Sequence, residues 1–319
     1  MKKFGIKLTL FTIIEGLLVL ICLCFSAYEP FKTTFARITD SEIYGGANNG
    51  TREIIPYIEK VQTPNGYTKL IVGDSVCGQV YNRFQKYNDD YCICGTNQAL
   101  TMAGQYLLIN SFLENNENVT DVYLIIISDS LKSDFNVQLS YQYMVIPFTQ
   151  KGELRNLEEE TQIEIEKKFG SFFCKPEIVN LIDKSPLNRK IYLNFLNFKS
   201  KIWSVEEDYE GIISDTAYVY LEKIIKLCEQ KDVEFHLIPG PHADRKEQHE
   251  QVKQMKQEIT GTIYANIIGE YLSEIEYYSV DLFRDSVHFD EDKVNEKFFA
   301  EIAQKDLPKD FCIINSLKD

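Results

Sequence analysis

The amino-acid sequence predicts an α/β fold, a three-layer αβα sandwich with a parallel central sheet. From residue 67 onward, short apolar segments that suit strands alternate with longer segments of helical periodicity. The segment 122–128 (VYLIIIS) is apolar almost throughout, as expected of a strand buried on both faces. Because crossovers between parallel strands are right-handed, this alternation places helices on both faces of the sheet. The expected strands are 69–73, 90–95, 122–128, 233–239 and 277–283, and the expected helices are 76–87, 97–113, 212–231, 248–259 and 290–303.

The N-terminal segment has the features of a membrane anchor. Lysines at the start of the chain precede an apolar run at 8–27, and about 20 helical residues span the roughly 30 Å hydrocarbon core. Positive charge on the near side favours a cytoplasmic N-terminus. We therefore expect residues 1–27 to form a single-pass transmembrane anchor, with the rest of the chain outside the cytoplasm. A cleaved signal peptide is the alternative, although Phe25 at the −3 position makes cleavage before Tyr28 unfavourable.

Two segments do not follow the alternation of strands and helices. Residues 28–66 are expected to form a stem with a short helix at 52–61, ahead of the main domain at 67–319. Residues 129–211 interrupt the main domain and include the aromatic stretch YQYMVIPF. We interpret them as an insertion over one end of the sheet, either a lid or substrate wall or additional helical packing.

Composition excludes several classes of function. The net charge of −14, without a basic cluster, disfavours nucleic-acid partners. Eight cysteines would permit disulfides outside the cytoplasm, but their pairing is open, and free or buried thiols are the favoured interpretation. The Cys92-x-Cys94 spacing is too tight for a zinc site, and there is no phosphate-binding loop. We therefore expect no metal and no cofactor.

A serine follows the first expected strand, in Gly73-Asp74-Ser75. In open parallel sheets, reactive groups collect beyond the carboxyl ends of the strands. The backbone N–H of Ser75 would lie at a helix N-terminus, where partial positive charge favours an oxyanion. The structural alternative is that Asp74 or Ser75 only caps the following helix.

A second polar pair follows the last expected strand. Asp285 and His288 are three residues apart, a spacing that places them on one face of a helical turn. The carboxylate can then hold the imidazole in one tautomer and stabilise its charged form. Of the four histidines, only His288 follows the final strand with an aspartate three residues earlier. A surface histidine near a helix start is the alternative.

The second expected strand ends in Gly95-Thr96-Asn97. Gly95 can present a backbone N–H to a ligand at close range. Asn97 could add a side-chain donor, although an Asn at this position also suits a helix N-cap.

Together these segments resemble the SGNH/GDSL hydrolase family, whose fold is flavodoxin-like. The resemblance runs from about residue 69 to residue 303. It implies that Ser75 is the nucleophile, that Gly95 donates its N–H to the oxyanion, and that Asp285 and His288 act as acid and base.

One block departs from the family pattern. The family's Gly-x-Asn-Asp after the third strand is replaced by Ser128-Asp129-Ser130, so the usual Asn donor is missing. Asn97, Ser128 or Ser130 would have to replace it. The chain is also similar to family branches of alginate acetylation and teichoic-acid D-alanylation, which carry an N-terminal membrane segment. The similar segments are GTNQALTMAGQYLL and LIPGPH.

The resemblance implies a membrane-anchored extracytoplasmic serine esterase or O-acyltransferase, acting on O-acetyl groups of a cell-envelope or exported polysaccharide. The implied partners are an acylated or acyl-accepting glycan, the membrane through residues 8–27, and a membrane-embedded acyl donor. Two alternatives remain open. One is a lipid or thioester acyl hydrolase, which would need an apolar tunnel. The other is a non-catalytic envelope protein that keeps the fold and binds glycan or assists assembly.

Overall fold

The computed structural model describes residues 2–26, 28, 49–135, 139–183, 188–189, 191–196, 212–308 and 311. Its centre is a parallel sheet with the strand order β2-β1-β3-β4. The strands are β1 (Lys69–Gly73), β2 (Tyr91–Gly95), β3 (Asp121–Ile126) and β4 (Glu234–Pro239). They agree with the first four expected strands, so the α/β class and the parallel central sheet are confirmed.

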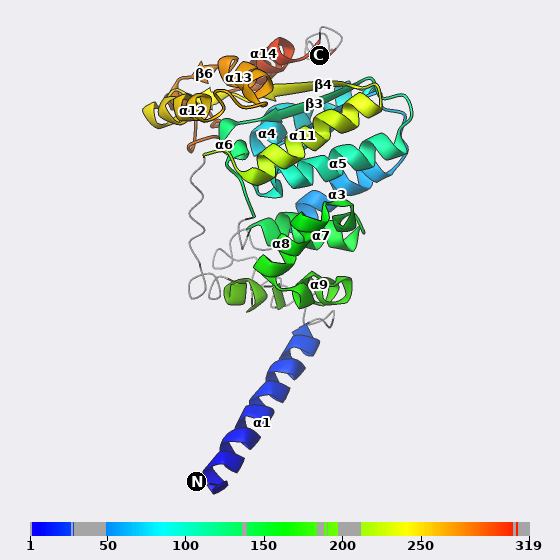
Figure 1. The fold of residues 1–319 in the computed structure, drawn as a ribbon, viewed down its shortest axis with the longest axis vertical. Coiled ribbons are helices and arrows are strands. Elements are labelled where there is room, and N and C mark those ends of the chain that lie inside the picture. Colours follow the sequence, from blue (N-terminus) through cyan, green and yellow to red (C-terminus); the bar gives the residue numbers. More distant parts are fainter. Residues whose placement is uncertain are drawn as a thin grey trace.

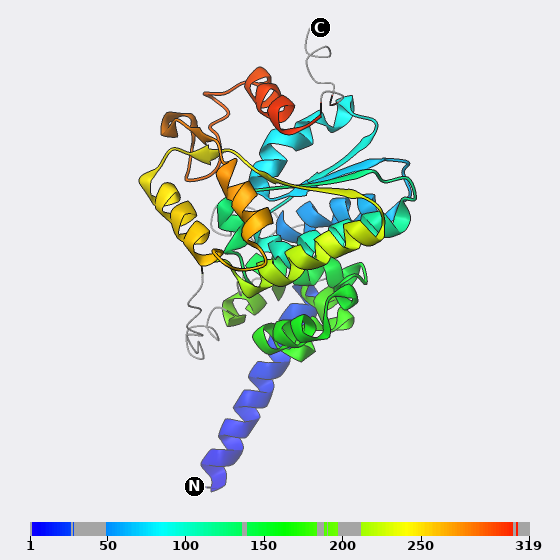
Figure 2. The same ribbon diagram turned by 45° about the horizontal axis from the view of Figure 1, so that its top comes forward.

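Alternate residues of the strands point to opposite faces, and both faces are buried. Leu70 and Val72 belong to one hydrophobic cluster, whereas Ile71 belongs to the other. The first face is covered by α3 (Asn49–Gln62), α5 (Thr101–Asn115) and α11 (Asp215–Gln230), and the second by α4 (Ser75–Tyr81) and α14 (Glu296–Asp306). Figure 2 shows these two groups of helices on opposite sides of the sheet, an arrangement compatible with a three-layer sandwich.

The remaining helices and short strands complete the domain (Figure 1). They are η2 (Asn82–Tyr87), η3 (Gln98–Leu100), α6 (Ser128–Leu131), η4 (Tyr141–Val145, a π-helical turn), α7 (Ile146–Gln150), η5 (Leu154–Asn156), α8 (Glu159–Phe169), η6 (Ser171–Cys174), α9 (Pro176–Asp183), β5 (His242–Ala243), α12 (Lys246–Glu258), α13 (Ala265–Ser273), β6 (Tyr277–Tyr278) and η7 (Val280–Leu282).

The expected fifth strand at 277–283 is wrong in its extent and its partner. Within this range the only strand of the described structure is β6, and it pairs with β5 in a separate two-stranded sheet. Pro239 ends β4 and Pro241 follows it, and proline has no N–H to continue a ladder. The chain then forms the 3₁₀ turn η7, and the helix expected from residue 290 begins at Glu296, where Asn295 caps it.

The helix expected within the stem is part of the folded core. In α3, the side chains of Ile54, Ile58 and Val61 are fully buried against the sheet and α5. This burial stabilises the helix although Pro56 lies inside it. Residues 29–48 of the predicted stem lie outside the described residues.

The described part of the 129–211 insertion is helical and packs on α3. Tyr141, Met144 and Phe148 are fully buried in the same hydrophobic cluster as α3 and α5. The described part of the insertion therefore provides additional helical packing. Residues 136–138, 184–187, 190 and 197–211 lie outside the described residues.

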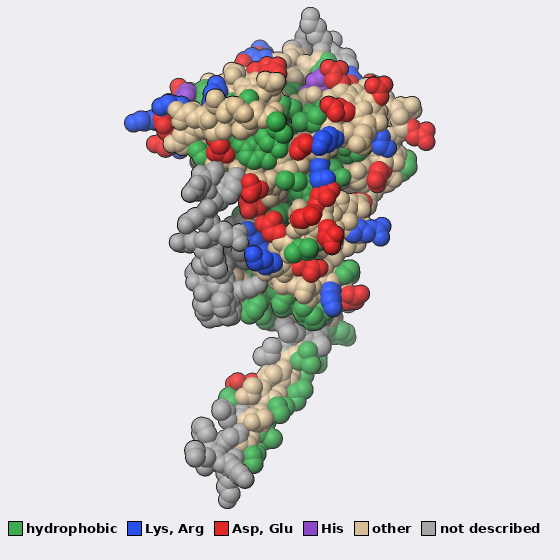
Figure 3. Space-filling view, viewed as in Figure 1, with side chains coloured by type: hydrophobic (Ala, Val, Ile, Leu, Met, Phe, Trp, Pro, Cys, Tyr) green, Lys and Arg blue, Asp and Glu red, His purple; other side chains and the backbone are tan. Residues whose placement is uncertain are grey.

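The N-terminal segment forms the helix α1 (Lys2–Ser26), which extends away from the rest of the chain in Figure 1. Apolar side chains run along the visible side of α1 (Figure 3), and Leu10, Leu17 and Phe25 are all more than half exposed. Among the described helices, none combines the length and the apolar character needed to cross a membrane. The anchor at 1–27 stays a prediction.

Candidate active site at the carboxyl edge of the sheet

The serine, histidine and aspartate expected from the sequence meet at one edge of the sheet. Ser75 Oγ lies 2.8 Å from His288 Nε2. On the other side of the ring, His288 Nδ1 lies 3.0 and 3.2 Å from the two carboxylate oxygens of Asp285. The chain order is Ser…Asp…His, and the contacts are those of a nucleophile, a base and a group that orients the base.

The position of Ser75 follows from the capping of α4 by its neighbour. Asp74 Oδ1 accepts hydrogen bonds from the N–H groups of Val76 and Cys77, which are otherwise unpaired at a helix start. Because Asp74 is the cap, the hydroxyl of Ser75 is left to contact His288. Asp74 can therefore cap α4 while Ser75 acts as the proposed nucleophile.

The second oxygen of Asp74 joins α4 to the end of β3. Oδ2 accepts from the Ile127 N–H at 2.8 Å and from Ser130 Oγ at 2.6 Å. The Asp74 side chain is fully buried, and burial raises its pKa while the four hydrogen bonds counteract only part of this effect. Ser130 therefore serves this network, and its hydroxyl proton is directed at Asp74.

Asp285 is held as a carboxylate. Burial alone would raise its pKa, but the backbone N–H groups of His288 and Val287 and the His288 ring lower the pKa to about 2. The Asp285 side chain is 45% exposed and the His288 side chain 21%. The ionised carboxylate fixes His288 Nδ1 as the protonated nitrogen of the neutral ring, which leaves Nε2 to accept a proton from Ser75.

A shallow cavity of about 340 Å³ opens beside Ser75 and His288. Its lining residues come from α3, α4, η2, the end of β2 and the 284–291 segment. They are Glu53, Tyr57, Ser75, Gly78, Gln79, Asn82, Arg83, Gly95, Thr96, Arg284, His288 and Glu291. None of these residues is aliphatic, so the described wall of the cavity is mainly polar.

Gly95 lies in this cavity, but its N–H is already bonded. It donates to Asn82 Oδ1 at 2.9 Å, and Asn82 Nδ2 donates to the Gly95 carbonyl at 2.8 Å. A Cβ at Gly95 would lie 2.3 Å from the backbone nitrogen of Gly78, so the glycine also allows α4 to pack on the end of β2. The role of the Gly95 N–H as an oxyanion donor stays a prediction. It requires the hydrogen bond from this N–H to Asn82 Oδ1 to break.

The other two expected donors lie elsewhere. The side chain of Asn97 accepts from the Ala99 N–H at 2.9 Å, which makes it the N-cap of η3. Ser128 is fully buried, and its Oγ lies 2.9 Å from Nε2 of the buried His242. Neither residue lines the Ser75 cavity.

The Ser128–His242 pair is a structural contact. His242 Nε2 also accepts from the Ser128 N–H at 3.0 Å, and its Nδ1 lies 2.7 Å from the Gly240 carbonyl. These partners define a neutral imidazole, and burial lowers the pKa of His242 accordingly. With both groups enclosed, no substrate reaches this serine in the described structure.

Three polar residues of the site, Tyr57, Gln79 and Asn82, were not predicted from the sequence. Tyr57 comes from α3, and its hydroxyl accepts from Asn82 Nδ2 at 2.8 Å. Gln79 bonds the backbone next to His288. The only local signal was that Gln79 lies four residues after Ser75, on the same face of α4.

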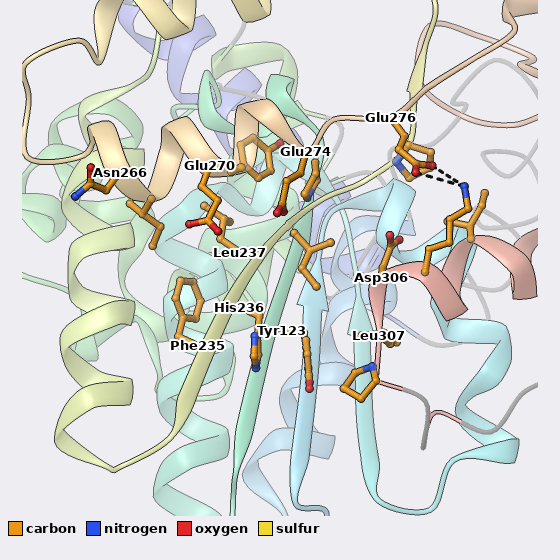
Figure 4. A pocket seen from close by; sticks show the side chains of 18 of the residues that line it. Tyr123, Phe235, His236, Leu237, Asn266, Glu270, Glu274, Glu276, Asp306 and Leu307 are labelled. Atoms are coloured by element: carbon orange, nitrogen blue, oxygen red, sulfur yellow. Dashed lines mark hydrogen bonds and ion pairs between the residues drawn. The ribbon is translucent and has the colours of Figure 1, made fainter.

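A second and larger cavity, of about 820 Å³, runs along β4 between α13 and α14 (Figure 4). It shares no lining residue with the Ser75 cavity. Of a group of three residues that could ligate a cation, Asp121, Glu234 and His236, only His236 lines this cavity, and its Nε2 lies 3.0 Å from Asp121 Oδ1. These residues stand at the start of β3 and β4, at the opposite edge of the sheet from Ser75. The described cysteines at 77, 92, 94 and 228 are free thiols.

Comparison with known proteins returned no family model, no curated protein and no solved structure that matches this chain. The membership of the SGNH/GDSL family stays a prediction.

Proposed function

We propose that the protein is a serine esterase or O-acyltransferase of the SGNH/GDSL type that works by covalent catalysis. The observation that carries the proposal is the 2.8 Å contact between Ser75 Oγ and His288 Nε2, with Asp285 on the far side of the ring. An activated nucleophile needs its base within hydrogen-bond distance and the base oriented by a third group, and both conditions are met.

The reaction proceeds in two halves. His288 Nε2 takes the hydroxyl proton as Ser75 Oγ bonds to the ester carbonyl carbon, and the departing alcohol then receives that proton from His288. This leaves an acyl-Ser75 intermediate. Water or a sugar hydroxyl next gives its proton to His288 and attacks the acyl carbon. Ser75 leaves with the proton, and the product is an acid or a new ester.

Two donors of the cavity suit the negative oxygen of the tetrahedral intermediate. In the described part of the chain, the Ser75 N–H at the start of α4 has no hydrogen-bond acceptor. Tyr57 is the second donor, because its hydroxyl accepts from Asn82 and keeps its own proton for a group in the cavity. Burial raises the pKa of Tyr57 to about 12, so the hydroxyl stays protonated at neutral pH.

Replacement of Tyr57 by phenylalanine tests this assignment. We expect kcat for an acetyl ester to fall about 10²-fold, the cost of one lost oxyanion donor. The matched control is Tyr67→Phe, a tyrosine that does not line the cavity. Steady-state kinetics should show unchanged kcat for Tyr67→Phe. A Tyr57→Phe enzyme with wild-type kcat would assign the second donor to Gly95 instead.

The cavity favours a short acyl group on a polar acceptor. The described residues line it with polar side chains and two glycines, and they offer no apolar tunnel for a long acyl chain. An open, shallow site also suits one hydroxyl of a long glycan chain better than a small enclosed molecule. We therefore propose an O-acetylated or acetyl-accepting polysaccharide as substrate. We also propose that residues 8–27 hold the site at the outer face of the membrane, near a membrane-embedded acyl donor.

Covalent labelling tests the proposed function directly. We expect a fluorophosphonate probe to label the native protein, because the reagent reacts with serines that a neighbouring histidine activates. Peptide mass spectrometry should find the adduct on Ser75, and heat-denatured protein should remain unlabelled. Absence of an adduct on the native protein would favour the alternative of a non-catalytic glycan-binding or assembly protein.

A further inference from the structure

Gln79 joins the helix of the nucleophile to the backbone next to the base. Its Oε1 accepts from the Phe289 N–H at 2.9 Å, and its Nε2 donates to the Phe289 carbonyl at 2.9 Å. Phe289 directly follows His288, and Gln79 lies one helical turn after Ser75. Because residues four apart share a helix face, Ser75 and Gln79 both face the segment that carries His288.

That segment is a closed loop whose internal shape is set by its own contacts. Phe283 and Phe289 form an isolated antiparallel bridge, and their rings stack at 4.4 Å between centroids. The Arg284 N–H donates to the His288 carbonyl at 3.0 Å. These contacts hold the loop 283–289 together, but they do not determine where the loop sits relative to α4.

Two other side chains attach the loop to α12, one from the residue before the helix and one from its first turn. Arg245 Nη2 donates to the Asp285 carbonyl at 3.1 Å, and Gln248 Nε2 donates to the Ser286 carbonyl at 3.4 Å. Apart from the contact between Ser75 and His288 themselves, the hydrogen bonds found between α4 and the loop among the described residues are the two made by Gln79.

We propose that Gln79 is a positioning residue that sets the distance between Ser75 and His288. The inference rests on the proposed function. The Gln79 amide donates one hydrogen bond to the backbone of Phe289 and accepts one from it, as a neighbouring strand would. These two bonds fix the position and the orientation of the Phe289 backbone relative to Gln79. Helix geometry then relates Gln79 to Ser75, and one peptide bond relates Phe289 to His288. The two hydrogen bonds of Gln79 and the 2.8 Å contact between Ser75 Oγ and His288 Nε2 therefore link the same two segments, so that the first constrain the length of the second.

The test compares two glutamines whose side-chain amides each donate to a backbone carbonyl and accept from a backbone N–H. Gln85 donates to the Tyr91 carbonyl at 2.7 Å and accepts from the Ile93 N–H at 2.8 Å, both on β2. Gln85 does not line the Ser75 cavity. Methionine preserves the side-chain length but removes both hydrogen bonds. In the full-length protein, Gln79→Met should lower kcat for an acetyl ester about 10²-fold, the effect of a shift near 1 Å in a reacting group, with KM changed little.

The control Gln85→Met should lose thermal stability to a similar degree but keep kcat within about threefold of wild type, because it disturbs no reacting group. Equal losses of kcat in the two variants would assign Gln79 a merely structural role. Wild-type kcat in Gln79→Met would overturn the inference while leaving the proposed function in place. A wild-type protein that no fluorophosphonate labels would instead reject the proposed function itself.

A second variant gives a readout that loss of stability does not produce. Gln79→Glu keeps an acceptor for the Phe289 N–H and places a negative charge near His288. Opposite charge favours the protonated imidazole, so the midpoint at which kcat/KM rises with pH should move to higher pH. The midpoint in Gln79→Met and Gln85→Met should stay at the wild-type value. An unmoved midpoint in Gln79→Glu would contradict the placement of this side chain beside the base.

Discussion

Replacing Ser75 with alanine should lower the hydrolysis of an acetyl ester about 10⁶-fold, because the nucleophile is removed. The variant lacks the oxygen that forms the acyl intermediate, while Asp74 still caps α4 through its own carboxylate, so the fold should persist. Initial rates with p-nitrophenyl acetate measure the effect, and circular dichroism checks folding. In cells, the ester content of envelope glycan should also differ between wild type and this variant, as mass spectrometry can measure.

The matched control for this experiment is Ser128→Ala. Ser128 also contacts a histidine, with Oγ 2.9 Å from His242 Nε2, but it is fully buried and outside the cavity. The control should keep turnover near the wild-type value. Loss of turnover in Ser128→Ala together with retention in Ser75→Ala would show that the wrong serine has been assigned.

Replacing Asp285 with asparagine should lower kcat about 10⁴-fold at neutral pH. The carboxylate accepts from the Nδ1 side of His288, whereas an amide can donate there and favour the tautomer with the proton on Nε2. That tautomer cannot take the proton of Ser75. Asp281→Asn is the control, because Asp281 is an exposed aspartate shortly before the site and lies outside the cavity.

The pH profile provides a further check on Asp285. Its folded pKa is lowered to about 2, so the charge is fully present above the ordinary aspartate value near 4 and is lost only as pH falls through about 2. Wild-type kcat/KM measured between pH 4 and 9 should therefore show no titration of this carboxylate. A profile with an acidic limb that disappears in Asp285→Asn would contradict the low pKa.

The candidate catalytic residues were accessible to sequence analysis because local patterns mark them. The apolar runs of β1 and β3 are buried on both faces, and in a parallel sheet their carboxyl ends fall at one edge. Ser75 comes directly after β1. The pair Asp285 and His288 has a spacing that is itself local.

The donors proposed for the oxyanion could not be predicted in the same way. Asn97 was correctly recognised as suited to a helix cap, because that contact spans two residues. The bond between Asn82 and Gly95 joins a helix end to a strand end, and Tyr57 comes from a helix expected in the stem. Such contacts depend on how whole elements pack.

The order of the first four strands along the chain, the parallel sheet, and the position of Ser75 beyond the end of β1 were determined by sequence alone, because hydrophobic periodicity and capping act within a few residues. The tertiary structure decided the rest: the shortened last strand, the enclosure of Ser128 with His242, the two bonds from Gln79 to Phe289, and the contribution of α3 to the cavity. These features depend on packing and hydrogen bonds between side chains that lie far apart in the chain. A local sequence pattern does not specify which of the possible long-range contacts forms.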